Sequence, residues 1–97
     1  MWVKIHKSSS RAVIAICDND LLGKKFEQDI RQLNVSESFY KGQQMSKQEV
    51  LNLMKIESSK ATFNIVGKDS IQSAIEIGIM DKTAIKKIKN IPFIIIV

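Results

Sequence analysis

The sequence predicts an α+β fold, a two-layer α/β sandwich in which a mixed sheet carries about two packed helices. Five stretches are predicted to be strands, most of which alternate between apolar and polar residues or are apolar throughout, and two others carry the spacing of amphipathic helices. The chain has 97 residues without a repeat, a low-complexity tract or a linker. Residues 1–97 are therefore expected to form a single domain.

The first two strands are expected at residues 2–6 and 12–17. Val3 and Ile5 alternate with polar or amphipathic neighbours, as in a half-buried strand, whereas residues 12–17 are apolar throughout. The polar loop at residues 7–10 is longer than a two-residue turn, so it predicts a hairpin without fixing its register.

Short Asx side chains at residues 18–20 indicate a chain break, because they bond readily to nearby backbone. We expect a brief helical turn from Leu21 to Phe26 and then a strand over residues 31–40. Leu33 and Val35 alternate with polar residues there, and an aromatic corner leads to Gly42.

The first long helix is predicted to begin after Ser46, which forms a capping box with Glu49, and to end near Glu57. Residues 61–66 read as a strand. A second helix is expected from Asp69, the predicted cap, to Gly78. This strand and helix together suggest half of a βαβ unit.

Two interpretations stand for residues 81–90. One is a helical turn capped by Asp81, and the other is a twisted strand whose lysines are solvated. Residues 91–97 are apolar on both faces and predict a strand that is covered on both sides or by a partner chain. Pro92 is expected at the first position of that strand.

Composition excludes several classes of protein. The longest apolar runs, at residues 12–17 and 93–97, are far shorter than the ~20 residues of a membrane helix. The first residues lack the features of a secretory signal, so we expect a cytoplasmic protein that has no contact with membranes. The single cysteine, Cys17, permits no internal disulfide and no four-cysteine zinc site.

The charge favours a polyanionic partner. The formal net charge is +5, with 15 basic against 10 acidic residues. The excess is spread along the chain, and only Arg11 and Arg31 are arginines, which argues against a surface built for bidentate recognition of bases. The densest basic group, residues 86–89, is either a solvated edge or a contact for phosphates.

Two motif-like stretches fail as sites, and we expect neither a metal nor another cofactor. Gly67-Lys68 is similar to the end of a phosphate-binding loop, but Thr62 stands where that motif needs glycine, and Asp69 stands where it needs a hydroxyl. The segment that begins at Asp18 opens like a calcium loop, but Leu22 occupies a ligand position.

A thiol-based site is the catalytic alternative. His6 could act as the base for Cys17, with Asp18 or Asp20 as the group that orients it, since a nucleophilic cysteine needs both. The competing interpretation is that Cys17 is a small buried apolar residue at the end of a strand and that His6 lies on the surface.

Aromatic residues stand beside cations at two places. Trp2 is close to Lys4, and Phe39-Tyr40 precede Lys41, as in platforms for single-stranded nucleic acid. The alternative is that both clusters seal a small core.

The sequence also resembles the short archaeal proteins known as domain of unknown function 424. The segments that carry the resemblance are Met1–His6, Ala15–Asp18 with Leu21–Lys24, Val35–Gly42, Asn64–Gly67 and Ile91–Pro92. The family often continues past this proline with a histidine, and here Phe93 stands instead.

The resemblance implies an archaeal source, a two-layer α/β arrangement and an association with translation genes, but no activity. If that family has a site, its motif residues in this chain are His6, Cys17, Asp18, Gly23, Lys24, Phe39, Tyr40 and Gly42.

These observations lead to three hypotheses for function. The first is a non-enzymatic module that binds RNA or a ribosomal particle and is linked to translation. The second is an enzyme or ligand-binding protein that uses the turn of residues 17–24 near His6. The third is a structural subunit whose last strand pairs with a protein partner, and the oligomeric state is left open. The predicted ligand- or RNA-binding residues are Lys4, His6, Cys17, Asp18, Gly23, Lys24, Phe39, Tyr40 and Lys41.

Overall fold

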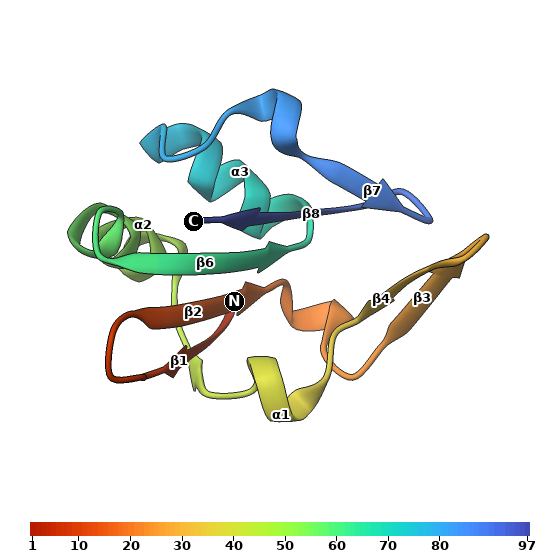
Figure 1. Cartoon of the computed structure of the whole chain (residues 1–97), viewed down its shortest axis with the longest axis horizontal. Coiled ribbons are helices and arrows are strands. Elements are labelled where there is room, and N and C mark those ends of the chain that lie inside the picture. The colour runs from red at the N-terminus through yellow and green to blue at the C-terminus, as the bar shows by residue number, and fades with distance from the viewer.

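The computed structural model describes residues 1–97 and has an α+β fold, as predicted (Figure 1). A mixed sheet has the strand order β5-β1-β2-β6-β8-β7. Its strands are β1 (Trp2–His6), β2 (Ala12–Cys17), β5 (Gln43–Gln44), β6 (Ala61–Val66), β7 (Lys86–Ile88) and β8 (Ile91–Ile96). A separate two-stranded ribbon consists of β3 (Lys25–Gln28) and β4 (Arg31–Asn34). The helices are α1 (Glu37–Tyr40), α2 (Lys47–Glu57) and α3 (Lys68–Ile77), and the 3-10 turns are η1 (Asn19–Leu21) and η2 (Lys82–Ala84).

The centre of the sheet is a parallel pair. β1 and β2 form the predicted antiparallel hairpin, in which Trp2 is opposite Cys17, and β2 runs parallel to β6. The βαβ unit therefore consists of β2, α2 and β6, whereas α3 precedes β8, which is antiparallel to β6. The prediction that β6 and α3 form half of such a unit is wrong in this respect, because α3 is followed by a strand that returns in the opposite direction.

The two long helices cover one face of the sheet. Met54 of α2 and Ala74 of α3 are fully buried against Ile14, Ile16 and Phe63. Successive strand residues point to opposite faces, so this face takes alternate residues of β2.

The opposite face is covered by η1, the β3–β4 ribbon and α1. Ala15 and Cys17 of β2 point to this side and pack in a second cluster with Leu33, Val35 and Tyr40. Because both faces are covered, β2 is apolar at every position, as the sequence pattern indicated.

The local signals around the two long helices are confirmed. Ser46 and Glu49 form the reciprocal capping box that begins α2, and that helix ends at Glu57 as predicted. Helix α3 ends at Gly78, which has a φ of 77° and takes the left-handed conformation typical of a C-terminal cap.

Two predicted elements between residues 19 and 40 differ from the structure. The helical turn spans Asn19–Leu21 rather than Leu21–Phe26, because the chain turns at Gly23 with a φ of 83° and then enters β3. The predicted strand over residues 31–40 stops at Asn34, since Ser36 accepts a hydrogen bond from the Phe39 N–H and begins α1.

Residues 81–90 contain both predicted alternatives. Asp81 caps the turn η2 by accepting hydrogen bonds from Thr83, and β7 follows. A two-residue turn of Lys89 and Asn90, both with positive φ, then leads into β8. Pro92 is the second residue of β8 rather than the first.

The outer edge of β8 is only partly covered. Its pairing with β7 ends at Phe93, so Ile94–Ile96 have a neighbouring strand, β6, on one side only. Ile95 is 62% exposed there. None of the helices in the structure combines the length and apolar character needed to cross a membrane.

Candidate functional site

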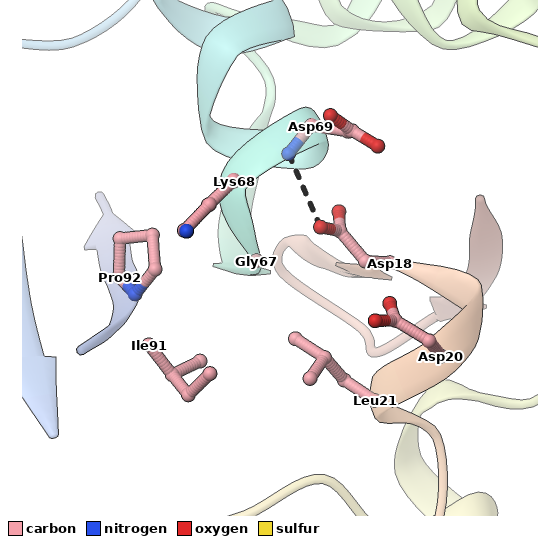
Figure 2. Close-up of a pocket in the computed structure, with 8 residues that line it drawn as sticks. All are labelled: Asp18, Asp20, Leu21, Gly67, Lys68, Asp69, Ile91 and Pro92. Carbon is pink, nitrogen blue, oxygen red and sulfur yellow. Dashed lines mark hydrogen bonds between the residues drawn. The ribbon is translucent and has the colours of Figure 1, made fainter. Parts of the chain in front are cut away.

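A hollow of about 280 Å³ opens at the carboxyl ends of the parallel strands β2 and β6, beside the first turn of α3 (Figure 2). The carboxyl ends of parallel strands are where ligands commonly bind in α/β sheets. The residues that line it are Asp18, Asp20, Leu21, Gly67, Lys68, Asp69, Ile91 and Pro92.

The Asp18 carboxylate is used to hold α3. It accepts hydrogen bonds from the Asp69 N–H at 3.1 Å, the Ser70 N–H at 2.8 Å and the Ser70 hydroxyl at 2.7 Å, and Asp18 is only 8% exposed. A carboxylate at this position satisfies free N–H groups and interacts favourably with the helix dipole. Asp18 therefore fills the role that the sequence pattern assigned to Asp69, and that prediction of the cap is wrong.

Gly67 lets this carboxylate come close. Its φ is 108°, and a Cβ built on it would lie 2.3 Å from the Asp18 Cγ. A side chain at residue 67 would thus displace the carboxylate from the end of the helix.

The other charged side chains of the hollow do not form a binding site for an anion. Asp20, Lys68 and Asp69 are exposed at its rim, where the two carboxylates oppose the approach of a phosphate. Nowhere in the chain do three or more His, Cys, Asp or Glu side chains group closely enough to hold a metal ion.

Cys17 and His6 lie far apart. Cys17 is fully buried, and burial, together with the Asp18 carboxylate, raises the pKa of its thiol to about 12. His6 pairs with Val13, four residues from Cys17 along β2, which corresponds to roughly 13 Å. The structure does not bring Cys17, Asp18 and His6 to one place.

The other predicted residues gather where α1 lies on β1. The His6 Nε2 is 2.8 Å from the Phe39 carbonyl oxygen, and the two rings stack with their centroids 4.6 Å apart. The Lys4 Nζ donates a hydrogen bond to the Ser38 carbonyl at 2.8 Å. The Lys41 ammonium lies 5.8 Å from the centroid of the Trp2 ring.

This cluster mainly fixes α1 to the sheet. Tyr40 is 5% exposed, and burial, with a smaller effect of Cys17, raises its pKa to about 12. Phe39 has one ring face against His6 and meets Tyr40 edge to face, while Lys41 pairs with Glu37 at 3.5 Å. Few of its aromatic faces and charges are thus free to receive a base or a phosphate.

Gly23 and Lys24 connect this region to the β3–β4 ribbon. The Gly23 N–H donates to the Val35 carbonyl at 2.7 Å, and the Val35 N–H donates to the Lys24 carbonyl at 2.9 Å. The Lys24 side chain is exposed.

Two hairpins lie side by side at one end of the molecule, where Figure 1 shows the β3–β4 tip next to the β7–β8 turn. The Arg31 Nη2 donates to the Lys87 carbonyl at 3.0 Å, and the Lys89 N–H donates to the Gln28 Oε1 at 2.9 Å. We call residues 25–31 and 86–90 together the hairpin pair.

The hairpin pair holds most of the excess charge. It contains five cations, Lys25, Arg31, Lys86, Lys87 and Lys89, against the two carboxylates Glu27 and Asp29. Its net charge of +3 accounts for more than half of the +5 of the whole chain. All five cations are exposed, and neither ion pair of the structure includes any of them.

Residues 86–89 are recognisable in the sequence as a basic group but are not among the predicted site residues, and neither are Lys25 and Arg31. The available signal was the pair of two-residue turns, Asp29-Ile30 and Lys89-Asn90, each flanked by short strands. Nothing in the local sequence predicts that the two turns are neighbours.

Two comparisons with known proteins find a similarity to this chain. A family model described as "Protein of unknown function (DUF424)" matches residues 6–97. A crystal structure of an uncharacterized conserved protein from Methanopyrus kandleri has a similar fold, with a TM-score of 0.77 and 24% sequence identity. The match covers 97% of this chain and 87% of that one. No curated protein matches the sequence.

Proposed function

We propose that this chain, which belongs to the DUF424 family, is a non-enzymatic RNA-binding module whose hairpin pair contacts the RNA backbone. The observation that carries this proposal is the set of five exposed cations on two adjacent hairpins, none of them in an ion pair. Cations that no protein carboxylate neutralises can neutralise phosphates and release the counterions of the nucleic acid.

The arrangement of these cations fits a backbone contact. Arg31 is held against the Lys87 carbonyl, so its guanidinium lies beside the neighbouring turn, and the lysines around it act as mobile point charges. Such groups bind phosphates without reading bases. The chain is then expected to bind RNA with a strong salt dependence and little sequence preference.

Two features support the non-enzymatic part of the proposal. The only thiol is buried with a raised pKa, so it is a poor nucleophile near neutral pH. The buried carboxylate beside it, Asp18, already accepts three hydrogen bonds from α3. The link to translation, and with it ribosomal RNA as the ligand, rests on the family resemblance and forms part of the proposal.

The test is filter binding of transfer RNA and ribosomal RNA fragments across a salt series. We compare the wild type with Lys87→Gln/Lys89→Gln and with a control of equal net charge, Lys55→Gln/Lys60→Gln. The control lysines are exposed and belong to no ion pair; Lys55 is in the last turn of α2, and Lys60 directly precedes β6. Figure 1 shows α2 and the start of β6 at the other end of the molecule from the two hairpins.

We expect the hairpin variant to bind about tenfold more weakly and to lower the slope of log K against log salt by about 1.5, because two phosphate contacts are lost. The control should keep nearly the whole slope. Equal losses in both variants would mean that net charge alone attracts RNA, and no binding by the wild type at low salt would refute the proposal.

A further inference from the structure

The tip of the β3–β4 ribbon carries an apolar side chain that nothing covers. Ile30 follows Asp29 in a two-residue turn, and its relative exposure is 101%. The other exposed isoleucines, Ile5, Ile56 and Ile95, are between 44% and 63% exposed and keep part of their surface against the protein.

The turn itself does not need this residue. Turns favour Gly, Asn, Asp and Ser, and Asp29 already occupies the position with positive φ, at 58°. A β-branched apolar residue at the tip costs solubility and packs against no part of the fold. The whole Ile30 side chain is therefore available to a contact outside the chain.

The surroundings of Ile30 indicate what that contact is. Arg31 follows it directly and reaches the backbone of Lys87, and the turn at Lys89 lies against Gln28 at the base of the same tip. An apolar tip behind which cations can reach phosphates matches the way in which many nucleic-acid-binding proteins insert an Ile, Leu or Phe wedge between bases. A protein pocket that received the same tip would have to be strongly acidic to accommodate these cations.

We infer that Ile30 is a wedge that inserts between adjacent bases of a structured RNA while the cations of the hairpin pair hold the flanking phosphates. This inference rests on the proposed function and adds the part of the RNA that is contacted. Separating two stacked bases costs a few kcal/mol, so the wedge should favour a bulge or a mismatch, where the stack is already weak.

The experiment uses an RNA hairpin with a one-nucleotide bulge and 2-aminopurine beside the bulge, whose fluorescence rises when its stacking is lost. Ile30→Ser is compared with the wild type and with Ile56→Ser, which removes an isoleucine from an exposed position on α2. Because Ile30 contacts nothing within the chain, Ile30→Ser should unfold at the same urea concentration as the wild type.

We expect the wild type and Ile56→Ser to raise the fluorescence, and Ile30→Ser to bind roughly tenfold more weakly without a rise. The salt slope of Ile30→Ser should stay unchanged, because no phosphate contact is lost.

Three outcomes would overturn the inference. Binding and fluorescence of Ile30→Ser equal to those of the wild type would mean that the tip contacts something other than bases, a protein for example, while RNA binding stands. A parallel loss of salt slope in Ile30→Ser would mean that the substitution disturbs the cations. A wild type that binds none of the RNA probes at low salt would remove the proposed function and the wedge together.

Discussion

The hollow beside α3 and the hairpin pair are neighbours along β8, yet their charged groups serve different purposes. At the hollow, the buried carboxylate of Asp18 is satisfied by three donors of α3. At the hairpin pair, five exposed cations have no acidic partner. A buried charge must be compensated by the protein that buries it, whereas an exposed charge remains available to a partner. The residues of the hollow, which resemble known binding motifs in the sequence, therefore stabilise the fold. The basic residues of the hairpin pair, which match no motif, remain available to a partner.

The largest effect is expected in the reactivity of the Cys17 thiol, which tests whether the region of the hollow beside α3 is structural. Since burial raises the pKa of Cys17 to about 12, the thiolate fraction at pH 8 should be roughly 1,000-fold lower in the folded chain than in the unfolded one. The rate of reaction with a disulfide reagent, measured with and without denaturant, should differ by at least that factor. A folded-state rate within tenfold of the denatured rate would reopen the case for a reactive cysteine.

Removal of the Asp18 carboxylate should have the next largest effect. Asp18→Ala leaves the Ser70 hydroxyl and two N–H groups of α3 without a partner, so we expect the free energy of unfolding to fall by about 3 kcal/mol in urea titrations. RNA affinity should not change, because the cations of the hairpin pair are untouched.

The control for this variant is Ser46→Ala, which removes an exposed local cap from α2 and should cost about 1 kcal/mol. If both substitutions cost the same, Asp18 acts as an ordinary cap. If Asp18→Ala abolishes RNA binding in a folded protein, the division between the two regions is wrong.

A smaller effect is expected at high pH. The pKa values of Cys17 and Tyr40 rise from 9.0 and 10.0 to about 12 on folding, so the folded state retains protons that the unfolded state loses. The contribution to stability is complete below about pH 9 and is lost as the pH rises toward 12. We expect the free energy of unfolding to decrease by about 1–2 kcal/mol between pH 8.5 and 10.

The matched variant for the pH series is Cys17→Ala/Tyr40→Phe, which removes both titrating groups and should flatten the profile over this interval. An equally steep profile in the variant would assign the effect to groups other than Cys17 and Tyr40.

Local signals predicted much of the fold. The capping box at Ser46, the left-handed end at Gly78, the apolar run of β2 and the strand-like segment of β6 each depend on residues that are close in sequence, so their elements were predicted correctly. The predicted strand at residues 31–40 failed where two local preferences competed. Alternation at Leu33 and Val35 indicated a strand, and the cap at Ser36 ended it.

The candidate site could not be predicted in the same way. Lys4, His6, Phe39 and Lys41 were predicted and do lie together, but they hold α1 on β1. The hairpin pair joins Arg31 to Lys87, which are 56 positions apart, and no periodicity or spacing reports such a distance.

The starts of the two long helices show what the local sequence determines and what the tertiary structure determines. The start of α2 was determined by the sequence itself, because Ser46 and Glu49 satisfy its free N–H groups from within one turn. The sequence predicted α3 within one residue of its observed start, but its capping partner was decided by the tertiary structure, because its N–H groups bond to Asp18, a residue that only the parallel pairing of β2 and β6 brings there. The same holds for the hairpin pair: composition set the number of positive charges, and packing set which of them meet on one surface, since electrostatic and hydrogen-bonding partners are chosen by proximity in space.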